Sequence, residues 1–313
     1  MSDRALLLTG MDAQNPLAFL ASLGLLRVLD DTLRASGHER PRLSFVDEGC
    51  PVPKLWTTMS EDEVVQRVLD DAAAQADNPA LRLAYNDAGE EVAPDGPGAI
   101  RDLKPPPELA RRALDRLAGT EPRASRLAAG WFSELVQDLK GNTKPTAFHF
   151  TAGQQAFLAM VDELRRGITA ADVREALFGP WLNTSRLPSL SWDSSVARLY
   201  ALRAGDPSKE KRGSIPAANW LGVIALELFP VVVRHGRLET TCMKGGWKDS
   251  AFTWPIWSVP LTLSTIAALL RTATDRWSQK ERAAAGISAM FRSKITRSDQ
   301  GGYGAFSPAE FVP

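Results

Sequence analysis

The chain has 313 residues, of which 44% are hydrophobic, and its 37 Lys and Arg balance 37 Asp and Glu. This length and apolar content predict a folded protein of one large or two modest domains and exclude a disordered chain. The charge is uneven, because residues 1–145 carry 17 basic and 23 acidic side chains, whereas residues 146–313 carry 20 and 14. We therefore expect any surface that attracts a polyanion to lie in the C-terminal half.

Cysteine usage and hydropathy indicate the compartment. Cys50 and Cys242 are too few and too far apart for a disulfide framework or a thiolate metal site. The opening residues lack the apolar core of a signal peptide, and no apolar run approaches the length of a membrane span. We expect a cytoplasmic protein that does not associate with membranes.

The clearest predicted element is a helix close to the N-terminus, after a short strand at 5–10. Asn15 is a suitable N-cap, Pro16 a first-turn residue, and Gly37 a terminator. Apolar residues follow helical spacing, and the small residues Ala21 and Gly24 would let another backbone approach closely. We expect this helix to lie in the core.

Helices and strands then alternate without a regular βαβ rhythm. In the N-terminal half we expect strands at 42–46, 54–58 and 81–85, helices at 61–76, 108–118 and 123–140, and an exposed loop at 87–107. In the C-terminal half we expect helices at 153–167, 169–179, 216–229, 262–277 and 279–290. We also expect a strand at 146–150, a hairpin that turns at His235 and Gly236, and an aromatic strand at 251–261. Thr169 and Asp172 resemble a capping box.

This order predicts an α+β fold, rich in helix, with short and mainly antiparallel strands. Residues 141–145 form the best internal boundary. They separate an acidic N-terminal region, 1–140, from a basic C-terminal region, 146–313, unless the two make one continuous domain.

Catalytic signatures are absent from the sequence. There is no Walker loop, dinucleotide fingerprint, nucleophile elbow or HExxH motif. His38, His149 and His235 are isolated from one another, and His149 is interpreted as structural. The acid pairs at 30–31, 70–71 and 90–91 are typical of solvated charge. We expect no catalysis, no metal and no cofactor.

Three basic segments in the C-terminal half combine cations with small hydroxyl residues, glycines or an aromatic. Such segments bind phosphate through Lys and Arg charge and backbone N–H groups, and an aromatic between cations suits base stacking. The candidate residues are Ser208, Lys209, Lys211 and Arg212 in the first segment, Lys244, Trp247 and Lys248 in the second, and Arg292, Lys294 and Arg297 in the third. If 289–296 is a strand, Arg292 and Lys294 share a face. A solvated basic surface is the alternative for each segment.

Two amide side chains near these cations, Asn219 and Gln300, have the groups that pair with an adenine edge, although either could equally cap a helix or a turn. The tryptophans are interpreted differently. Large aromatics dominate burial, so we expect core positions for Trp181, Trp192, Trp220, Trp254 and Trp257.

Several phrases of the sequence together resemble one family. They are NPLAFLASLGLLRVL, FHFTAGQQAFL, WDSSVARLYALRAGDPSKEKRGSIPAANWLGVIALELFP, FTWPIW and ITRSDQGGYGAFSPAEF. Their order and spacing are similar to the small CRISPR-associated subunits of type I-G systems, formerly I-U, which stand in for the large subunit of Cascade. The resemblance spans nearly the whole chain, except for the acidic stretch from about 60 to 125.

The resemblance implies a non-catalytic subunit of an antiviral ribonucleoprotein. Its partners would be a CRISPR guide RNA, target double-stranded DNA and other Cascade subunits, while a separate helicase-nuclease cuts the target. In such complexes base pairing reads the sequence, and protein reads a short flanking motif and backbone shape.

Two other classes remain open from the sequence. One is a nucleic-acid-processing enzyme whose metal-binding carboxylates converge only in three dimensions. The other is a scaffold that binds only protein, for which the apolar and tryptophan-rich segments supply surface.

Overall fold

The computed structural model describes residues 5–35, 37, 39–120, 122–151, 155–196, 213–246, 249–272, 274–297 and 303–313. The helices are α1 (Pro16–Ala35), α2 (Glu61–Ala74), α3 (Pro107–Thr120), α4 (Pro122–Ala129), α5 (Phe157–Gly167), α6 (Ala170–Leu177), α7 (Pro216–Ala225), α8 (Leu263–Arg271) and α9 (Gln279–Ala284). The strands are β1 (Ala5–Leu7), β2 (Arg42–Asp47), β3 (Pro51–Trp56), β4 (Phe132–Gln137), β5 (Thr143–Pro145), β6 (Val231–Arg234), β7 (Arg237–Thr240), β8 (Met243–Lys244), β9 (Ala251–Trp257), β10 (Leu261–Thr262), β11 (Ile287–Arg297), β12 (Gly304–Phe306) and β13 (Glu310–Phe311).

These elements confirm the α+β prediction. One sheet has the order β1-β3-β2-β10, a second has the order β12-β11-β9-β8 with β13 also paired to β11, and β4-β5 and β6-β7 form hairpins. Every pairing between the described strands is antiparallel. Within the described residues, no helix has both the length and the hydropathy needed to cross a membrane.

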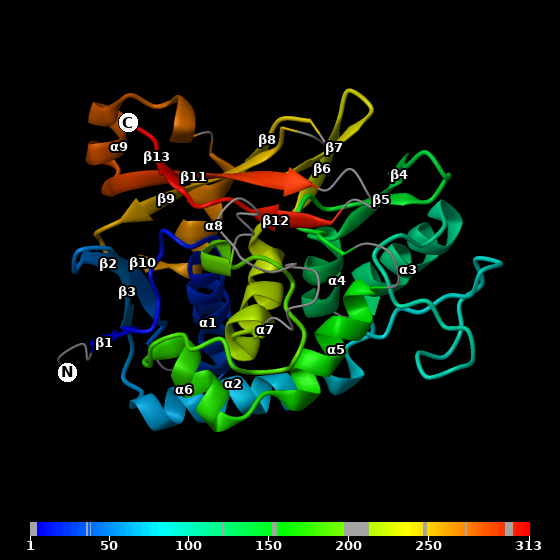
Figure 1. Ribbon diagram of the computed structural model, residues 1–313, viewed down its shortest axis with the longest axis horizontal. Coiled ribbons are helices and arrows are strands. Elements are labelled where there is room, and N and C mark those ends of the chain that lie inside the picture. The colour runs from blue at the N-terminus through cyan, green and yellow to red at the C-terminus, as the bar shows by residue number, and fades with distance from the viewer. Residues whose placement is uncertain are drawn as a thin grey trace, which may run out of the picture.

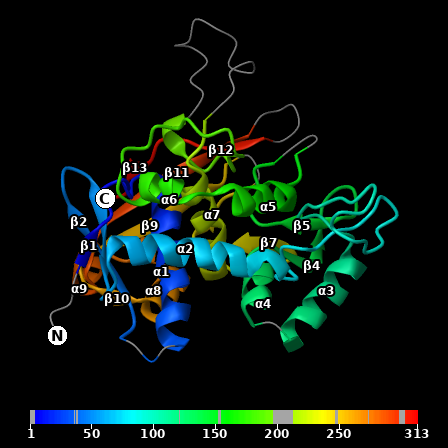
Figure 2. The same ribbon diagram turned by 90° about the horizontal axis from the view of Figure 1, so that it is seen from below.

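Helices α1 and α7 lie side by side at the centre of the molecule (Figure 1). All residues of α7 are buried, and α1 is buried from Pro16 to Asp30. Helices α2, α5 and α6 cover the lower side, as the view from below shows (Figure 2), and the sheet that contains β9 and β11 covers the upper side. The hydrophobic core is contributed by both halves of the chain, and β10 pairs with β2 across the expected boundary.

The local signals for α1, α6 and the β6-β7 hairpin are confirmed. The Asn15 side chain caps α1 by accepting the Leu17 N–H at 3.0 Å. Thr169 and Asp172 form the predicted capping box of α6. His235 and Gly236 have φ angles of 50° and 71°, the pair of positive values that a two-residue type I′ hairpin requires.

Tryptophan indoles connect the two halves, as expected of core residues. Trp192, Trp220, Trp254 and Trp257 are fully buried. Trp254 Nε1 donates to Ala13 O at 3.0 Å, and Trp257 Nε1 donates to Leu43 O at 2.8 Å, so β9 is fixed to the N-terminal half. Trp181 is partly buried against the core.

A buried ion network joins α1, α4 and the turn after α7. The side chain of Glu227 is only 1% exposed and accepts Arg27 Nε at 2.8 Å, Arg126 Nε at 3.0 Å and Arg123 Nε at 3.3 Å. Arg123 also pairs with Asp71 of α2. The network explains why charged residues can occupy this helix junction, since each buried charge has a partner of opposite sign.

Four predicted elements are wrong in the structure. Residues 81–85 form turns with isolated bridges at Tyr85, and residues 146–150 are a loop. The helix expected at 123–140 ends at Ala129, and the next residue, Gly130, packs on the backbone of Leu226, where a Cβ would lie 2.3 Å from the carbonyl oxygen. The helix expected at 279–290 ends at Ala284, and strand β11 begins at Ile287.

Candidate nucleic-acid interface

The five-stranded sheet brings two of the three basic segments to one face. Lys244 on β8 and Lys294 on β11 both stand opposite Ala251 of the intervening strand β9. Directly opposed residues point to the same side of a sheet, so the two lysines share a face, with Cα atoms ~10 Å apart at the usual strand spacing. Arg292 lies two residues before Lys294 on that face, as predicted for a strand. We call Lys244, Arg292 and Lys294 the basic sheet face.

The three cations of this face differ in how far they are neutralised. Lys244 pairs with Asp275 and keeps a half-exposed side chain. Arg292 donates from Nε to Thr253 Oγ1 at 3.3 Å and stands opposite Glu310 of β13. Lys294 is exposed and makes no ion pair with any described residue. Positive charge on this face is therefore centred on Lys294.

Arg297 has a different role from the one predicted. It lies at an odd spacing from Arg292 and Lys294, so it points to the other side of β11. Its guanidinium donates to Ala147 O at 3.3 Å and to His149 O at 3.4 Å. Burial lowers the pKa of Arg297 to about 10. This side chain ties β11 to the loop at 147–150 rather than facing solvent.

Asn219 is likewise an internal residue. It is 1% exposed, its Oδ1 accepts the Leu190 N–H at 2.9 Å, and its Nδ2 donates to Ile215 O at 2.9 Å. Because both ends of the amide are used within the core, the geometry does not place Asn219 where it would contact a base.

The remaining candidate residues lie outside the described part of the chain. They are Ser208, Lys209, Lys211 and Arg212 of the first segment, Trp247 and Lys248 of the second, and Gln300. The described residues that flank the second pair are closely joined, since Gly246 N–H donates to Asp249 Oδ1 at 2.6 Å.

The 147–150 segment is hydrogen-bonded to residues that lie close in sequence to two undescribed stretches, 197–212 and 298–302. Trp192, five residues before 197, donates from Nε1 to Phe148 O at 2.9 Å. Gly304, two residues after 302, donates its N–H to Phe150 O at 3.2 Å. Arg297, one residue before 298, is held by the same segment. Trp192, Arg297 and Gly304 are thus all hydrogen-bonded to one segment, 147–150.

His149 belongs to a buried polar cluster within this support. Asp102 Oδ1 and Thr151 Oγ1 both lie 2.8 Å from its Nε2. A nucleophile–histidine–carboxylate relay needs its two partners on different ring nitrogens, so this cluster does not have that geometry. Burial raises the pKa of Asp102, but the hydrogen bond and charge of His149 outweigh burial and hold the pKa below its ordinary value. The structural interpretation of His149 fits this arrangement.

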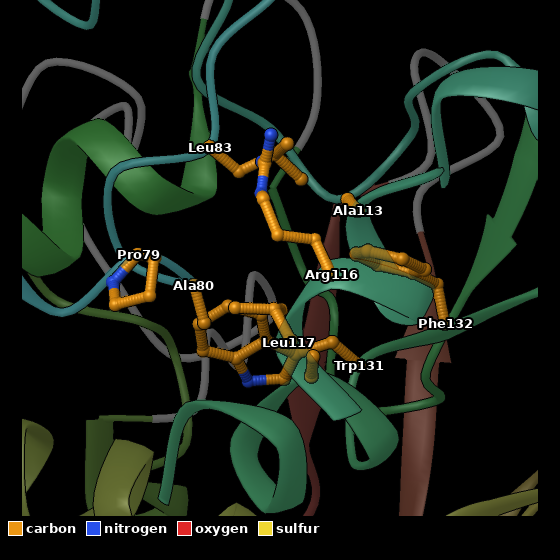
Figure 3. A pocket seen from close by; sticks show the side chains of 9 residues that line it. Pro79, Ala80, Leu83, Ala113, Arg116, Leu117, Trp131 and Phe132 are labelled. Atoms are coloured by element: carbon orange, nitrogen blue, oxygen red, sulfur yellow. The ribbon is translucent and has the colours of Figure 1, made fainter. Parts of the chain in front are cut away.

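No group of three His, Cys, Asp or Glu side chains within the described residues is arranged to hold a metal ion. Cys50 and Cys242 are free thiols. The apolar cavity between α3 and α4 has a volume of about 10 Å³, which is room for a single water at most. Leu83 and the end of Arg116 lie at one side of it and the indole of Trp131 at the other (Figure 3). It is too small to bind a ligand.

The sequence interpretation missed an arginine-lined cleft beside α5. The cleft has a volume of about 410 Å³ and is lined by Arg101, Ala159, Asp162, Glu163, Arg166, Gly167 and Leu187. A signal for it was present, because Arg165 and Arg166 follow Asp162 at the helical spacings of three and four. The contribution of Arg101, 61 residues away from Asp162, could only come from the fold.

No family model matches the chain, and no curated protein is significantly similar to it. The resemblance to type I-G subunits therefore remains a resemblance of phrases. Parts of three phrases lie in elements of the core: NPLAFLASLGLLRVL covers most of α1, PAANWLGVIA forms α7, and FTWPIW lies in β9.

Proposed function

We propose that the protein is a non-catalytic subunit of a cytoplasmic CRISPR type I, Cascade-like ribonucleoprotein in antiviral defence. In this role it binds the guide RNA, the backbone of the target DNA and its flanking motif, or both. The observation that carries the proposal is the basic sheet face, in which Lys244 and Lys294 flank Ala251 in register.

Two further features support the proposal. The strand that carries Arg292 and Lys294 is tied to the 147–150 segment through Arg297, which gives these two cations a rigid base. The zero net charge suits a subunit that meets nucleic acid across one face within an assembly, rather than a protein that binds it alone.

The test is the salt dependence of binding by the complex purified from its native operon, with sequencing of any RNA that co-purifies. In the variant Arg292→Ala/Lys294→Ala, affinity should fall for all sequences alike. The slope of log affinity against log salt should shrink by about one for each phosphate that is no longer neutralised. Lys280→Ala, an exposed lysine on α9, is the matched control and should bind as wild type.

Three outcomes contradict the proposal. The first is an unchanged affinity and slope in a normally folded double variant. The second is a complex that survives RNA digestion and holds no nucleic acid, which would favour the protein-only scaffold. The third is metal-dependent cleavage by the pure chain that disappears on a single Asp or Glu substitution, which would favour the enzyme.

A further inference from the structure

The cleft beside α5 concentrates three arginines around one carboxylate. Asp162 Oδ2 accepts Arg101 Nη1 at 3.0 Å and Arg166 Nη2 at 2.7 Å, and Asp162 Oδ1 accepts Arg165 Nη2 at 2.9 Å. Burial raises the pKa of Asp162, but the hydrogen bonds from Arg101 and Arg165 outweigh it, and the pKa stays below its ordinary value. Counting Glu163, the group carries three positive and two negative charges.

The three arginines differ in how exposed their side chains are and in how many hydrogen-bond partners they have. Arg101 and Arg165 have side chains 12% and 11% exposed and also donate to the carbonyls of Leu81 and Ala72. Arg166 is 61% exposed, and Asp162 is its only partner among the described residues. A guanidinium has five N–H donors in a planar fork, so Arg166 keeps donors that face the cleft and solvent.

The position of the cleft connects it to the first basic segment. Leu187, which lines the cleft, accepts Ser214 Oγ on its carbonyl at 2.7 Å. Gly213 lies directly against the chain at Asn183, where a Cβ would be 1.3 Å from the carbonyl oxygen. Lys211 and Arg212 immediately precede Gly213 in sequence. Ser214, two residues after Arg212 in the sequence, is thus bound to a residue that lines the cleft.

We propose that this cleft is a phosphodiester subsite for a single nucleic-acid strand, with Arg166 as the direct phosphate ligand. Arg101 and Arg165 supply positive potential and, through Asp162, hold Arg166 in place. The inference rests on the proposed function and extends it, since it adds a phosphate contact that is distinct from the basic sheet face. Arginine suits this position because its fork matches the geometry of a phosphate.

The test measures affinity against salt concentration by fluorescence anisotropy, on the full chain together with any partners that co-purify with it. The probe is a labelled single-stranded oligouridylate of about 16 nucleotides, the upper end of common site sizes. The DNA equivalent forms a second arm. A higher affinity for one probe identifies the strand that the subsite takes, and equal affinities show that it reads only the shared phosphate backbone.

Arg166→Ala should weaken binding several-fold and reduce the salt slope by about one, because one phosphate is no longer neutralised. Arg166→Lys should keep the slope and recover part of the affinity. Glu163→Gln should strengthen binding, because it removes an exposed negative charge from the cleft. Arg111→Ala is the matched control, since Arg111 is 60% exposed and pairs with Glu108 at 2.7 Å, much as Arg166 pairs with Asp162.

Arg166→Ala should fold normally, because Asp162 keeps Arg101 and Arg165 as partners. If Arg166→Ala has the same affinity and salt slope as Arg111→Ala, while Arg292→Ala/Lys294→Ala loses affinity, the cleft inference is wrong and the proposed function stands. If the wild-type protein binds neither single-stranded probe, the cleft inference is wrong, and the salt dependence of the complex purified from its native operon decides the proposed function separately.

Discussion

Gly24 of α1 lies directly on the backbone of Leu221 of α7, so that a Cβ on Gly24 would sit 1.8 Å from the Leu221 carbonyl oxygen. We expect Gly24→Ala to destabilise the protein by at least about 2 kcal/mol, because the two central helices would have to separate. Chemical denaturation measures the change. Gly119→Ala in α3 is the control, since no atom lies within 4 Å of its Cβ position, and it should be neutral or slightly stabilising. Equal stability of the two variants would contradict the close approach of the helices.

Glu227 should be essential for stability because three arginines converge on its buried carboxylate. Glu227→Ala leaves Arg27, only 7% exposed, without its closest partner, and should cost about 3–5 kcal/mol. The control is Glu108→Ala, which breaks an exposed pair with Arg111 and should cost under about 1 kcal/mol. Similar unfolding midpoints for both variants would show that the network contributes little.

Asp102 should make stability depend on pH in the acidic range. Its pKa is below the ordinary value in the folded protein, so its contribution is present above the ordinary carboxyl pKa and is lost as pH falls through the folded pKa. At pH 7, Asp102→Asn should be about 1–3 kcal/mol less stable than wild type. The difference should shrink as pH falls below about 4, the ordinary carboxyl pKa, because Asp102 then binds a proton in the unfolded chain before it does so in the folded protein. Urea unfolding at pH 7 and pH 3.5 tests this, and a pH-independent difference would refute it.

Two cations on β11 should behave differently when removed. Arg297→Ala deletes the hydrogen bonds to Ala147 and His149 and should lower the free energy of unfolding by about 1–3 kcal/mol. Lys294→Ala removes an exposed side chain and should stay within about 0.5 kcal/mol of wild type. Thermal melts of both variants measure the difference. A larger loss of stability in Lys294→Ala than in Arg297→Ala would mean that the two residues are assigned to the wrong faces of β11.

Local sequence signals predicted the elements whose ends carry specific chemistry. Asn15 and Pro16 indicated the start of α1, Thr169 with Asp172 that of α6, and His235-Gly236 the β6-β7 turn, because each acts through hydrogen bonds or backbone angles within a few residues. Gly24 was also recognised as a close-approach site, although its partner Leu221 lies in the other half of the chain.

The elements that were predicted wrongly are those whose structure depends on tertiary contacts. Phe148, His149 and Phe150 alternate like a strand, yet all three are buried, because the loop passes between the sheet and α5. Gly130, the first residue after α4, packs on Leu226, a residue almost a hundred positions away.

The candidate site could be predicted only in part, because it too depends on tertiary contacts. The period of two correctly placed Arg292 and Lys294 on one face of β11. The sequence interpretation grouped Arg297 with these two residues, although the same period places Arg297, three residues after Lys294, on the opposite face of β11. The pairing of Lys244 with Lys294 across Ala251 depends on strand register, and the arginine cleft depends on the approach of Arg101 to Asp162. Neither arrangement is encoded in a local pattern.

The packing of α1 against α7 also determines when the chain can fold during synthesis. Helix α1 is buried from Pro16 to Asp30, but its partner helix α7 emerges from the ribosome about 200 residues later, which at ordinary translation rates is roughly 10–40 s. Until then α1 can be covered only by earlier elements such as α2 and β2, and the surface around Gly24 that packs on Leu221 stays exposed. We therefore expect a chain that is truncated before α7 to aggregate rather than to form a stable N-terminal fragment.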